Sequence, residues 1–191
     1  MARFTFKEIR DDLWSDFEAL FGSSGACGGC WCQSWRVPQG GKLWEETKGK
    51  RAHQLTKKLI LSNQMTGLLA YEGNKPVGWC SYGPRVVFPR LERMKAYRRD
   101  DTEGVWSVNC FFIPKEYRRK GLSRRMLAAA LKFMKKRRVR VVEAYPVPPT
   151  LDGSKLPGAF VWTGPLSIFE SAGFEIVQRL SYSRPLLRLR L

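Results

Sequence analysis

The sequence has no apolar run that approaches the roughly 20 residues a helix needs to cross a membrane. Its first residues, MARFTFKEIRDDLW, carry acidic side chains where a secretory signal would have its apolar segment. Histidine occurs once and cysteine five times, an odd number that cannot close fully into pairs. Together these features favour reduced thiols. We therefore expect a cytoplasmic protein without a membrane partner.

Acidic side chains are also scarce. The 191 residues include 17 Asp and Glu against 34 Lys and Arg, which gives a formal charge of +17. Such an excess repels itself unless anions lie nearby, so nucleic acid, an acidic membrane face or a phosphorylated ligand is a natural partner. The alternative is a solvated basic surface that aids solubility. Hydrophobic residues make up 43% of the chain, which indicates a globular core and not a disordered chain.

Strand-like and helix-like segments alternate along the chain. Alternating apolar residues predict strands, and apolar residues on one helical face predict helices; in the helix expected at 46–63, Ala52, Leu55 and Leu59 should face inward. Gly73 and Asn74 separate two strand-like segments, as in a tight hairpin. The predicted strands are 4–9, 66–73, 75–83, 104–114, 139–147 and a last strand in 175–191, and the predicted helices lie near 13–21, 46–63, 122–138 and 165–173. This pattern predicts an α/β fold with a mixed sheet, in one domain spanning 1–191.

Positive charge gathers around one glycine where the fourth predicted strand hands over to a helix. The segment YRRKGLSRR places Gly121 at the start of that helix, among arginines and a lysine. A helix N-terminus carries free N–H groups and partial positive charge, so this segment suits a pyrophosphate. It is neither the Walker P-loop nor the dinucleotide fingerprint, whose glycine patterns are absent. The basic residues in the body of the helix are better explained as a solvated face.

FFIPKEYRRKGLSRRML resembles motif A of the GNAT superfamily of acyl-CoA-dependent N-acyltransferases, with Ser123 in place of the usual glycine or alanine. The order of predicted elements and the segment IFESAGFEIV also resemble this family. The resemblance implies a single-domain fold whose mixed, mostly antiparallel sheet of six to seven strands is flanked by helices and splayed at an acyl-CoA cleft. It implies an N-acetyltransferase in which an amine directly attacks acetyl-CoA or another acyl-CoA.

The resemblance also implies which residues hold the cofactor. The backbone of Phe111, Phe112 and Ile113 would pair with the pantetheine like an added strand. The pyrophosphate would lie on the N–H groups of residues 119–123. The cofactor-binding residues are therefore expected to be Phe111, Phe112, Ile113, Arg118, Arg119, Lys120, Gly121, Leu122, Ser123 and Arg124. Among them, Arg118, Arg119, Lys120 or Arg124 could meet the 3′-phosphate.

The expected catalytic groups depart from the family pattern. Phe169 stands where many members have a tyrosine acid, and Ser107 stands near the position of their glutamate base. Strict alternation in 106–113 would place Ser107 and Asn109 on one face with Phe111 and Ile113, and Trp106, Val108, Cys110 and Phe112 on the other. Glu143 and Tyr145 share a face of the next strand and could serve as base and acid. The alternative is ordinary strand exposure for the first pair, and a surface carboxylate with a packing tyrosine for the second.

CGGCWCQSWR contains Cys27, Cys30 and Cys32 at a spacing that can bind zinc. A fourth ligand would have to be His53, Cys80 or Cys110, and a single C-x-x-C is a weak signal. We expect no metal and instead a packed wall beside the acceptor. The resemblance to the family places Trp31, Trp35 and Arg36 near that acceptor.

Two other functions compete with acyl transfer. The charge and the seven tryptophans would also suit a basic protein associated with nucleic acid or ribosomes. A relative that binds CoA without catalysis is a third possibility, because Phe169 lacks a proton to donate. Weak association with nucleic acid could accompany the enzyme activity. The acceptor is not identified by the sequence, and the protein could be a monomer or a homodimer.

Overall fold

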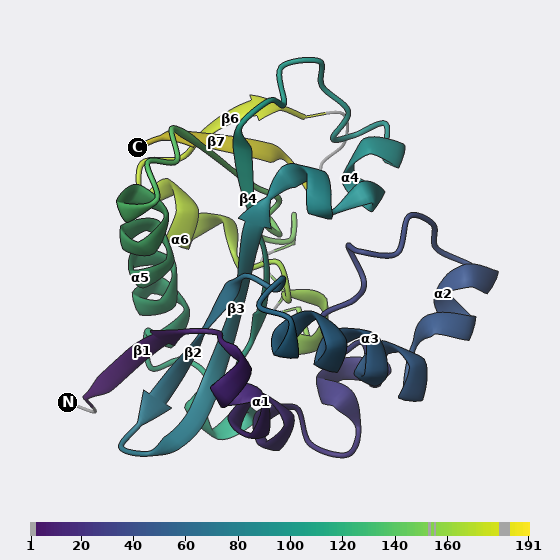
Figure 1. The fold of residues 1–191 in the computed structure, drawn as a ribbon. Helices are drawn as coiled ribbons and strands as arrows, with labels where there is room; N and C mark the ends of the chain where they lie inside the picture. Colours follow the sequence, from purple (N-terminus) through teal and green to yellow (C-terminus); the bar gives the residue numbers. More distant parts are fainter. Residues whose placement is uncertain (1–2, 153, 155, 180–183) are drawn as a thin grey trace.

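In the computed structural model, which describes residues 3–152, 154, 156–179 and 184–191, one seven-stranded sheet runs through the chain (Figure 1). The strand order is β1-β2-β3-β4-β5-β7-β6. β4 and β5 pair in parallel, and the other neighbours pair antiparallel. The strands are β1 (Phe4–Glu8), β2 (Gly67–Glu72), β3 (Lys75–Pro84), β4 (Val105–Phe112), β5 (Val141–Ala144), β6 (Glu175–Gln178) and β7 (Leu186–Arg190). The mixed, mostly antiparallel α/β sheet expected from the sequence is confirmed.

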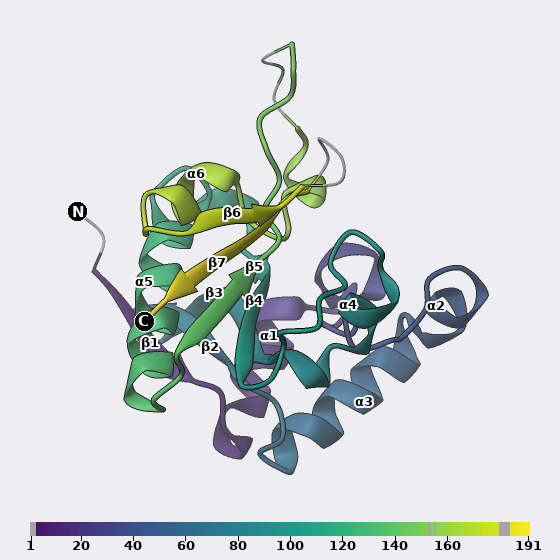
Figure 2. The ribbon, with the colours of Figure 1, turned by 90° about the horizontal axis from the view of Figure 1, so that it is seen from above.

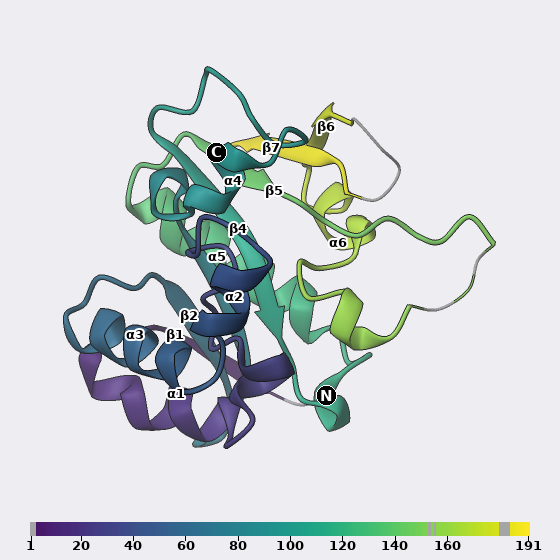
Figure 3. The ribbon, with the colours of Figure 1, turned by 90° about the vertical axis from the view of Figure 1, so that its right-hand side faces the viewer.

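Helices cover both faces of the sheet (Figures 1 and 2). α5 and α6 pack on one face, and α1 and α3 pack on the other, with α2 and α4 farther out. The helices are α1 (Trp14–Phe21), α2 (Lys42–Thr47), α3 (Lys50–Leu61), α4 (Pro89–Arg93), α5 (Leu122–Lys136) and α6 (Leu166–Glu170). Short turns η1 (Asp11–Leu13), η2 (Gly25–Gly29), η3 (Arg85–Val87), η4 (Lys115–Tyr117) and η5 (Gly158–Phe160) join them. The segment after β5, up to residue 152, projects from the body of the molecule (Figure 3).

Three apolar clusters follow from this layering. The first lies between the sheet and α5 and includes Met126, Leu127 and Ala130. The second lies under α1, η2 and α3 and is rich in aromatic rings, including Phe17 and Trp79. A third, smaller cluster joins Trp35 to α4 and the end of β5. Burying large aliphatic and aromatic side chains in this way is the main favourable term in folding.

The single helix predicted for 46–63 is wrong. The chain breaks at Gly49, which has a φ of +77°, so α2 ends at Thr47 and α3 begins at Lys50. A φ in this range is open to glycine at little cost, which explains the break. The inward face of α3 is Ala52, Thr56 and Ile60, whereas Leu55, which was expected to face inward, is exposed.

Residues 175–191, for which the sequence predicts one last strand, contain two strands that pair as a hairpin. β6 and β7 pair antiparallel, and residues 180–183 between them lie outside the described part of the chain. The apolar alternation continues through both halves of the segment, so periodicity alone did not reveal the turn. β7 pairs with β5 on its other side and thereby extends the sheet by two strands.

A bulge in β4 overturns the alternation expected for 106–113. Ser81 of β3 pairs with Cys110 and Tyr82 pairs with Val108, so Asn109 is the extra residue of β4. An inserted residue reverses which face the following side chains occupy. Phe111 therefore joins the α5 side of the sheet, and Cys110 joins the α1 side.

β5 pairs along its whole length with the first half of β4, and the two chains then diverge. Their register runs from Val105 opposite Val141 to Val108 opposite Ala144, whereas β4 continues to Phe112. Figure 3 shows the chain after β5 leaving the line of β4. The splay expected in the middle of the sheet is therefore present, and it begins at the bulge.

Candidate active site

The N-terminus of α5 is open and surrounded by basic side chains. Gly121, the residue before the helix, has a φ of +72°, and a Cβ built there would meet nothing within 4 Å. Within the described part of the chain, no side chain caps this helix end. Arg118, Arg119, Lys120 and Arg124 are exposed around it, whereas the Leu122 side chain is buried in the core. Free N–H groups with flanking cations suit a phosphate-bearing ligand.

Beyond the splay, the protein's own chain covers the edge of β4. The N–H of Phe111 donates a hydrogen bond to the carbonyl of Trp162 at 2.6 Å. The Nε of Arg118 donates to the carbonyl of Ile113 at 2.8 Å. Residues 162–165 are held there by hydrogen bonds between Val147 and Gly164 and between Leu166 and Val147, both at 2.9 Å. Two backbone groups at which the sequence predicts a cofactor are therefore engaged within the chain.

A cavity of about 170 Å³ lies beside this stretch of β4. It is bounded by β4, the cysteine-rich turn and three tryptophans. Its lining residues are Phe21, Ala26, Cys27, Cys30, Cys32, Ser34, Trp35, Trp44, Cys110, Phe111, Phe112 and Trp162. Four of the five cysteines therefore meet at one cavity, and the described residues of its lining include no carboxylate, histidine, lysine, arginine or tyrosine.

The thiols around this cavity differ in acidity. The pKa of Cys32 is lowered to about 7. Hydrogen bonding from Cys110 is the main cause, and the Trp79 indole and the charge of Arg36 act in the same direction. Burial of the thiol opposes this shift. The indole N–H of Trp79 donates to the Cys32 sulfur at 3.2 Å. Burial raises the pKa of Cys30 to about 11. The hydrogen bond to Cys32, together with burial, raises the pKa of Cys110. Donated hydrogen bonds and a nearby cation favour the thiolate, and burial favours the thiol.

Ser107, Glu143 and Tyr145 come together in a buried polar network. The Tyr145 hydroxyl donates to Glu143 at 2.8 Å and lies 2.9 Å from the Ser107 hydroxyl. Arg85 donates to the same Glu143 oxygen, and Arg188 donates twice to the other, at 2.8 and 3.0 Å. Glu143 is fully buried, as are Ser107 and Tyr145. Burial and a negative neighbour raise the pKa of Tyr145.

This network changes the interpretation of Glu143 and Tyr145. The sequence suggested a base and an acid facing the cofactor seam, but neither residue lines the cavity. Both oxygens of Glu143 already accept hydrogen bonds from arginine, so the carboxylate is held within this network. Paired buried charges of this kind hold neighbouring elements in register. The alternative of a surface carboxylate is excluded by its burial.

The other expected site residues lie in different surroundings; they are Asn109, Trp31, Trp35 and Arg36. The indole N–H of Trp35 donates to the backbone carbonyl of Asn109 at 2.9 Å, which places Trp35 directly on the bulge. The Asn109 amide is buried and has no hydrogen-bond partner among the described residues. The same holds for Nε and Nη2 of Arg36, whose guanidinium stacks over Phe88 at 5.0 Å. Trp31 faces another cavity. Asn109 and Trp35 are thus the residues of this set that reach the β4 seam.

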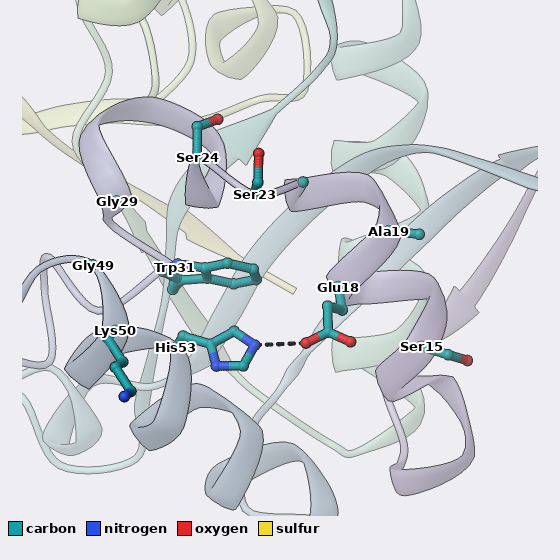
Figure 4. Close-up of a pocket in the computed structure, with 11 residues that line it drawn as sticks. Ser15, Glu18, Ala19, Ser23, Ser24, Gly29, Trp31, Gly49, Lys50 and His53 are labelled. Carbon is teal, nitrogen blue, oxygen red and sulfur yellow. Dashed lines mark hydrogen bonds and ion pairs between the residues drawn. The ribbon is translucent and has the colours of Figure 1, made fainter.

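That second cavity, of about 640 Å³, lies between α1 and α3 (Figure 4). The single histidine, His53, contacts Glu18 there at 2.6 Å from Nε2 to Oε1, beneath the ring of Trp31 (Figure 4). His53 is therefore committed to Glu18 and does not join the cysteines. Among the described residues, no group of three or more His, Cys, Asp or Glu side chains is placed to hold a metal ion. The larger cavity does not touch β4, so the smaller one is the better candidate site.

Comparisons with known proteins identify the family. The model of the Acetyltransferase (GNAT) family matches residues 7–152, which is more than half of the chain. The protein belongs to the GNAT family. A search of curated proteins finds no match. In the described part of this GNAT protein, no helix is long and apolar enough to cross a membrane.

Solved structures of GNAT proteins share the fold. PaiA N-acetyltransferase of Thermoplasma acidophilum, in complex with coenzyme A, has a TM-score of 0.57 at 12% identity, over 99% of each chain. The Salmonella typhimurium protein yncA, solved with acetyl-CoA, has a TM-score of 0.52 at 12% identity, over 98% of this chain and 94% of that one. The ribosomal-protein-S5-alanine acetyltransferase of Vibrio fischeri has a TM-score of 0.53 at 15% identity, over 100% and 94%. At these identities the likeness concerns the fold alone.

Sequence reasoning missed three residues of this region. Arg85 lies in a basic segment without periodicity, yet its side chain is 1% exposed and anchors the Glu143 network. Trp162 follows a proline- and glycine-rich loop, and nothing in the sequence places its carbonyl on β4. The sequence offers Cys110 to the site only as a possible zinc ligand, and the bulge brings it to the cavity beside Cys32. A lone arginine directly after Gly83-Pro84, at the end of an apolar strand, was the one available signal.

Proposed function

We propose that this GNAT protein is an acyl-CoA-dependent N-acetyltransferase. Acetyl-CoA would lie across the N-terminus of α5 and the second half of β4, and an amine of the acceptor would enter the cavity lined by Cys32, Cys110 and Trp35. When bound, acetyl-CoA supplies the acetyl group as a thioester, which the amine attacks directly. The identity of the acceptor is not part of the proposal.

One observation carries this proposal. An uncapped helix N-terminus with open space at Gly121 follows, on one continuous strand–turn–helix, from a β4 segment that borders a cavity. The phosphates would accept hydrogen bonds from the N–H groups of residues 119–123, and the exposed cations nearby would offset their charge. A cavity of about 170 Å³ is small enough to exclude most water around a reacting amine.

The backbone of β4 would orient the thioester. A Phe111 N–H donor aimed at the acetyl carbonyl would stabilise the charge that develops on its oxygen. This donor now bonds to Trp162, so residues 162–164 must give way or shift for the contact to form. The backbone of Phe112 and Ile113 would continue the pairing along the pantetheine. Holding two reactants in place supplies ~7–11 kcal/mol at best, so strong acid–base residues are not essential.

The polar residues proposed from the sequence receive different roles. Asn109, at the bulge, has a buried amide without a partner in the described chain and could hold a water or an acceptor group. Ser107, Glu143 and Tyr145 would position the strands that form the splay and would not exchange protons with the substrate. This assignment follows from their hydrogen bonds and from their absence at the cavity wall.

Calorimetric titration with acetyl-CoA tests the proposal. The protein should bind acetyl-CoA, and Gly121→Glu should abolish binding because it adds bulk and negative charge at the phosphate site. Gly104→Glu is the matched control: Gly104 also has a positive φ and open space, but it precedes β4 at the opposite end of the strand. No binding by the parent protein would refute the proposal. In that case salt-dependent binding of nucleic acid would be the next function to measure.

Binding without transfer would support a different function. Phe169 is a fully buried phenyl ring that contacts Phe111 and Phe174, so the position used by many family members for an acid cannot donate a proton. If the protein consumes no acetyl-CoA with any amine in a screen of acceptors, a CoA-binding protein without catalysis is favoured. Consumption with one class of amine would favour the enzyme and identify its acceptor.

A further inference from the structure

Among the described residues, the wall of the cavity beside β4 has only one kind of ionisable group, the thiol. An amine that enters the site as an ammonium ion must lose a proton before it can attack a thioester. The described lining residues offer four thiols and no carboxylate or imidazole. Glu143, the nearest candidate from the sequence, is held by Arg85 and Arg188 away from the cavity. The proton acceptor must therefore be a thiolate or water.

Cys32 is the thiol whose surroundings favour ionisation. Its sulfur receives the Trp79 indole N–H at 3.2 Å, and Cys110 lines the same cavity. Arg36 adds positive charge, and no carboxylate among the described residues pairs with its buried Nε and Nη2 atoms. Unpaired buried charge is costly, so a thiolate nearby would stabilise this guanidinium. Arg85, by contrast, is a buried arginine that forms ion pairs with Glu92 and Glu143.

We propose that Cys32, ionised as a thiolate, is the general base that takes the proton of the acceptor ammonium. The inference rests on the proposed function above. The Cys32 sulfur takes the first proton of the ammonium and becomes a thiol. As the new N–C bond forms and the C–S bond of the thioester breaks, the second proton leaves the nitrogen with the departing thiolate. Cys32 then returns its proton to water, so the protein is regenerated.

The neighbouring groups set the pH at which Cys32 can act. The titratable groups that face it are Cys30 on its own turn, Cys80 on β3 and Cys110 on β4, with Arg36 as the cation. Burial raises the pKa of Cys30 to about 11 and raises that of Cys80, so both stay protonated near neutrality. The pKa of Cys32, about 7, lies below that of an ordinary thiol, near 8.5, so a larger share of Cys32 is ionised near neutrality.

The first experiment measures the thiolate without any acceptor. The full-length protein is treated with iodoacetamide between pH 5 and 10, and alkylation of each cysteine is followed by peptide mass spectrometry. Cys32 should react with a half-maximal rate near pH 7, and saturating acetyl-CoA should slow it at least tenfold. Arg36→Met should move the midpoint upward, and Arg36→Lys should restore most of the shift. Cys30→Ser is the matched control from the same cavity and should leave the Cys32 profile unchanged.

The second experiment tests whether Cys32 acts as a general base or as a nucleophile. Loss of the thioester is followed at 232 nm with water alone and with a panel of primary amines. Cys32→Ser should keep acetyl-CoA binding by calorimetry, lower kcat at least tenfold and remove the rise in kcat near pH 7. Unchanged kcat in Cys32→Ser, or a Cys32 midpoint above pH 8.5, would overturn the inference. So would an acetyl group found on Cys32 by intact mass, since the residue would then be a nucleophile. Failure of the parent protein to bind acetyl-CoA would instead refute the proposed function.

Discussion

Replacement of Arg85 by methionine should destabilise the protein strongly. The Arg85 side chain is 1% exposed and donates hydrogen bonds to Glu143, Tyr145, Glu92 and the carbonyl of Tyr97. Methionine keeps the length but leaves a buried carboxylate short of one cation. Removing one partner of a buried ion pair typically costs about 3–5 kcal/mol. Because Arg188 still holds Glu143, we expect about 3 kcal/mol, which lowers the Tm by roughly 6–12 °C at this chain length.

Urea unfolding of four variants checks this value. Arg93→Met, on the exposed side of α4, is the control and should change the free energy of unfolding by less than about 0.5 kcal/mol. Glu143→Gln removes the charge that Arg85 compensates, so the double variant should lose less than the sum of the two single variants. A coupling of about 1–3 kcal/mol is expected from the double-mutant cycle. Strict additivity, or an Arg85→Met variant as stable as the parent, would refute the buried network.

Two further changes test other parts of the structure. Gly164→Ala should lower the free energy of unfolding by about 1–3 kcal/mol, since Gly164 has a φ of +88° and a Cβ would lie 2.9 Å from the Phe169 ring; a thermal melt equal to that of the parent would contradict this placement. Hydrogen bonds from Arg99 and then Arg188 hold the pKa of Asp101 well below its usual range. The ionised Asp101 carboxylate therefore stabilises the fold above pH ~4. This stabilisation is lost as the pH falls through the pKa of Asp101 in the folded state. Asp101→Asn should therefore be less stable than the parent at pH 7 and differ less at pH 3 in urea unfolding, whereas an equal difference at both would exclude the ion pairs.

Local pattern was enough to predict most of the fold. Gly73 and Asn74 mark the β2–β3 hairpin, and the apolar face of 122–138 gives α5 nearly to its ends. These signals are short-range, because a turn or a helical face depends on neighbouring residues. The cradle at Gly121 was predictable for the same reason: the glycine, the basic residues and the helix start are contiguous.

The candidate site depends on long-range contacts that no local pattern contains. The bulge at Asn109 is set by pairing with β3, and it decides that Cys110 faces the cavity with Cys32. Glu143 alternates like a strand residue whether it meets solvent or Arg85, since the two residues are 58 positions apart. The sequence could therefore propose Glu143 and Tyr145 as a reactive pair, but it could not show that Arg85 and Arg188 bind Glu143.

The hydrogen bond between Phe111 and Trp162 has a consequence for affinity and for solubility together. Without it, the second half of β4 would present an open strand edge, which can pair with other chains and lead to aggregation. Any ligand that uses the Phe111 N–H must compete with residues 162–164, so its apparent affinity falls in proportion to the fraction of molecules in which that donor is free. A tenfold excess of the covered form would cost about 1.4 kcal/mol of binding. The same contact therefore protects the ligand-free protein from pairing through the β4 edge and lowers its affinity for any ligand that displaces residues 162–164.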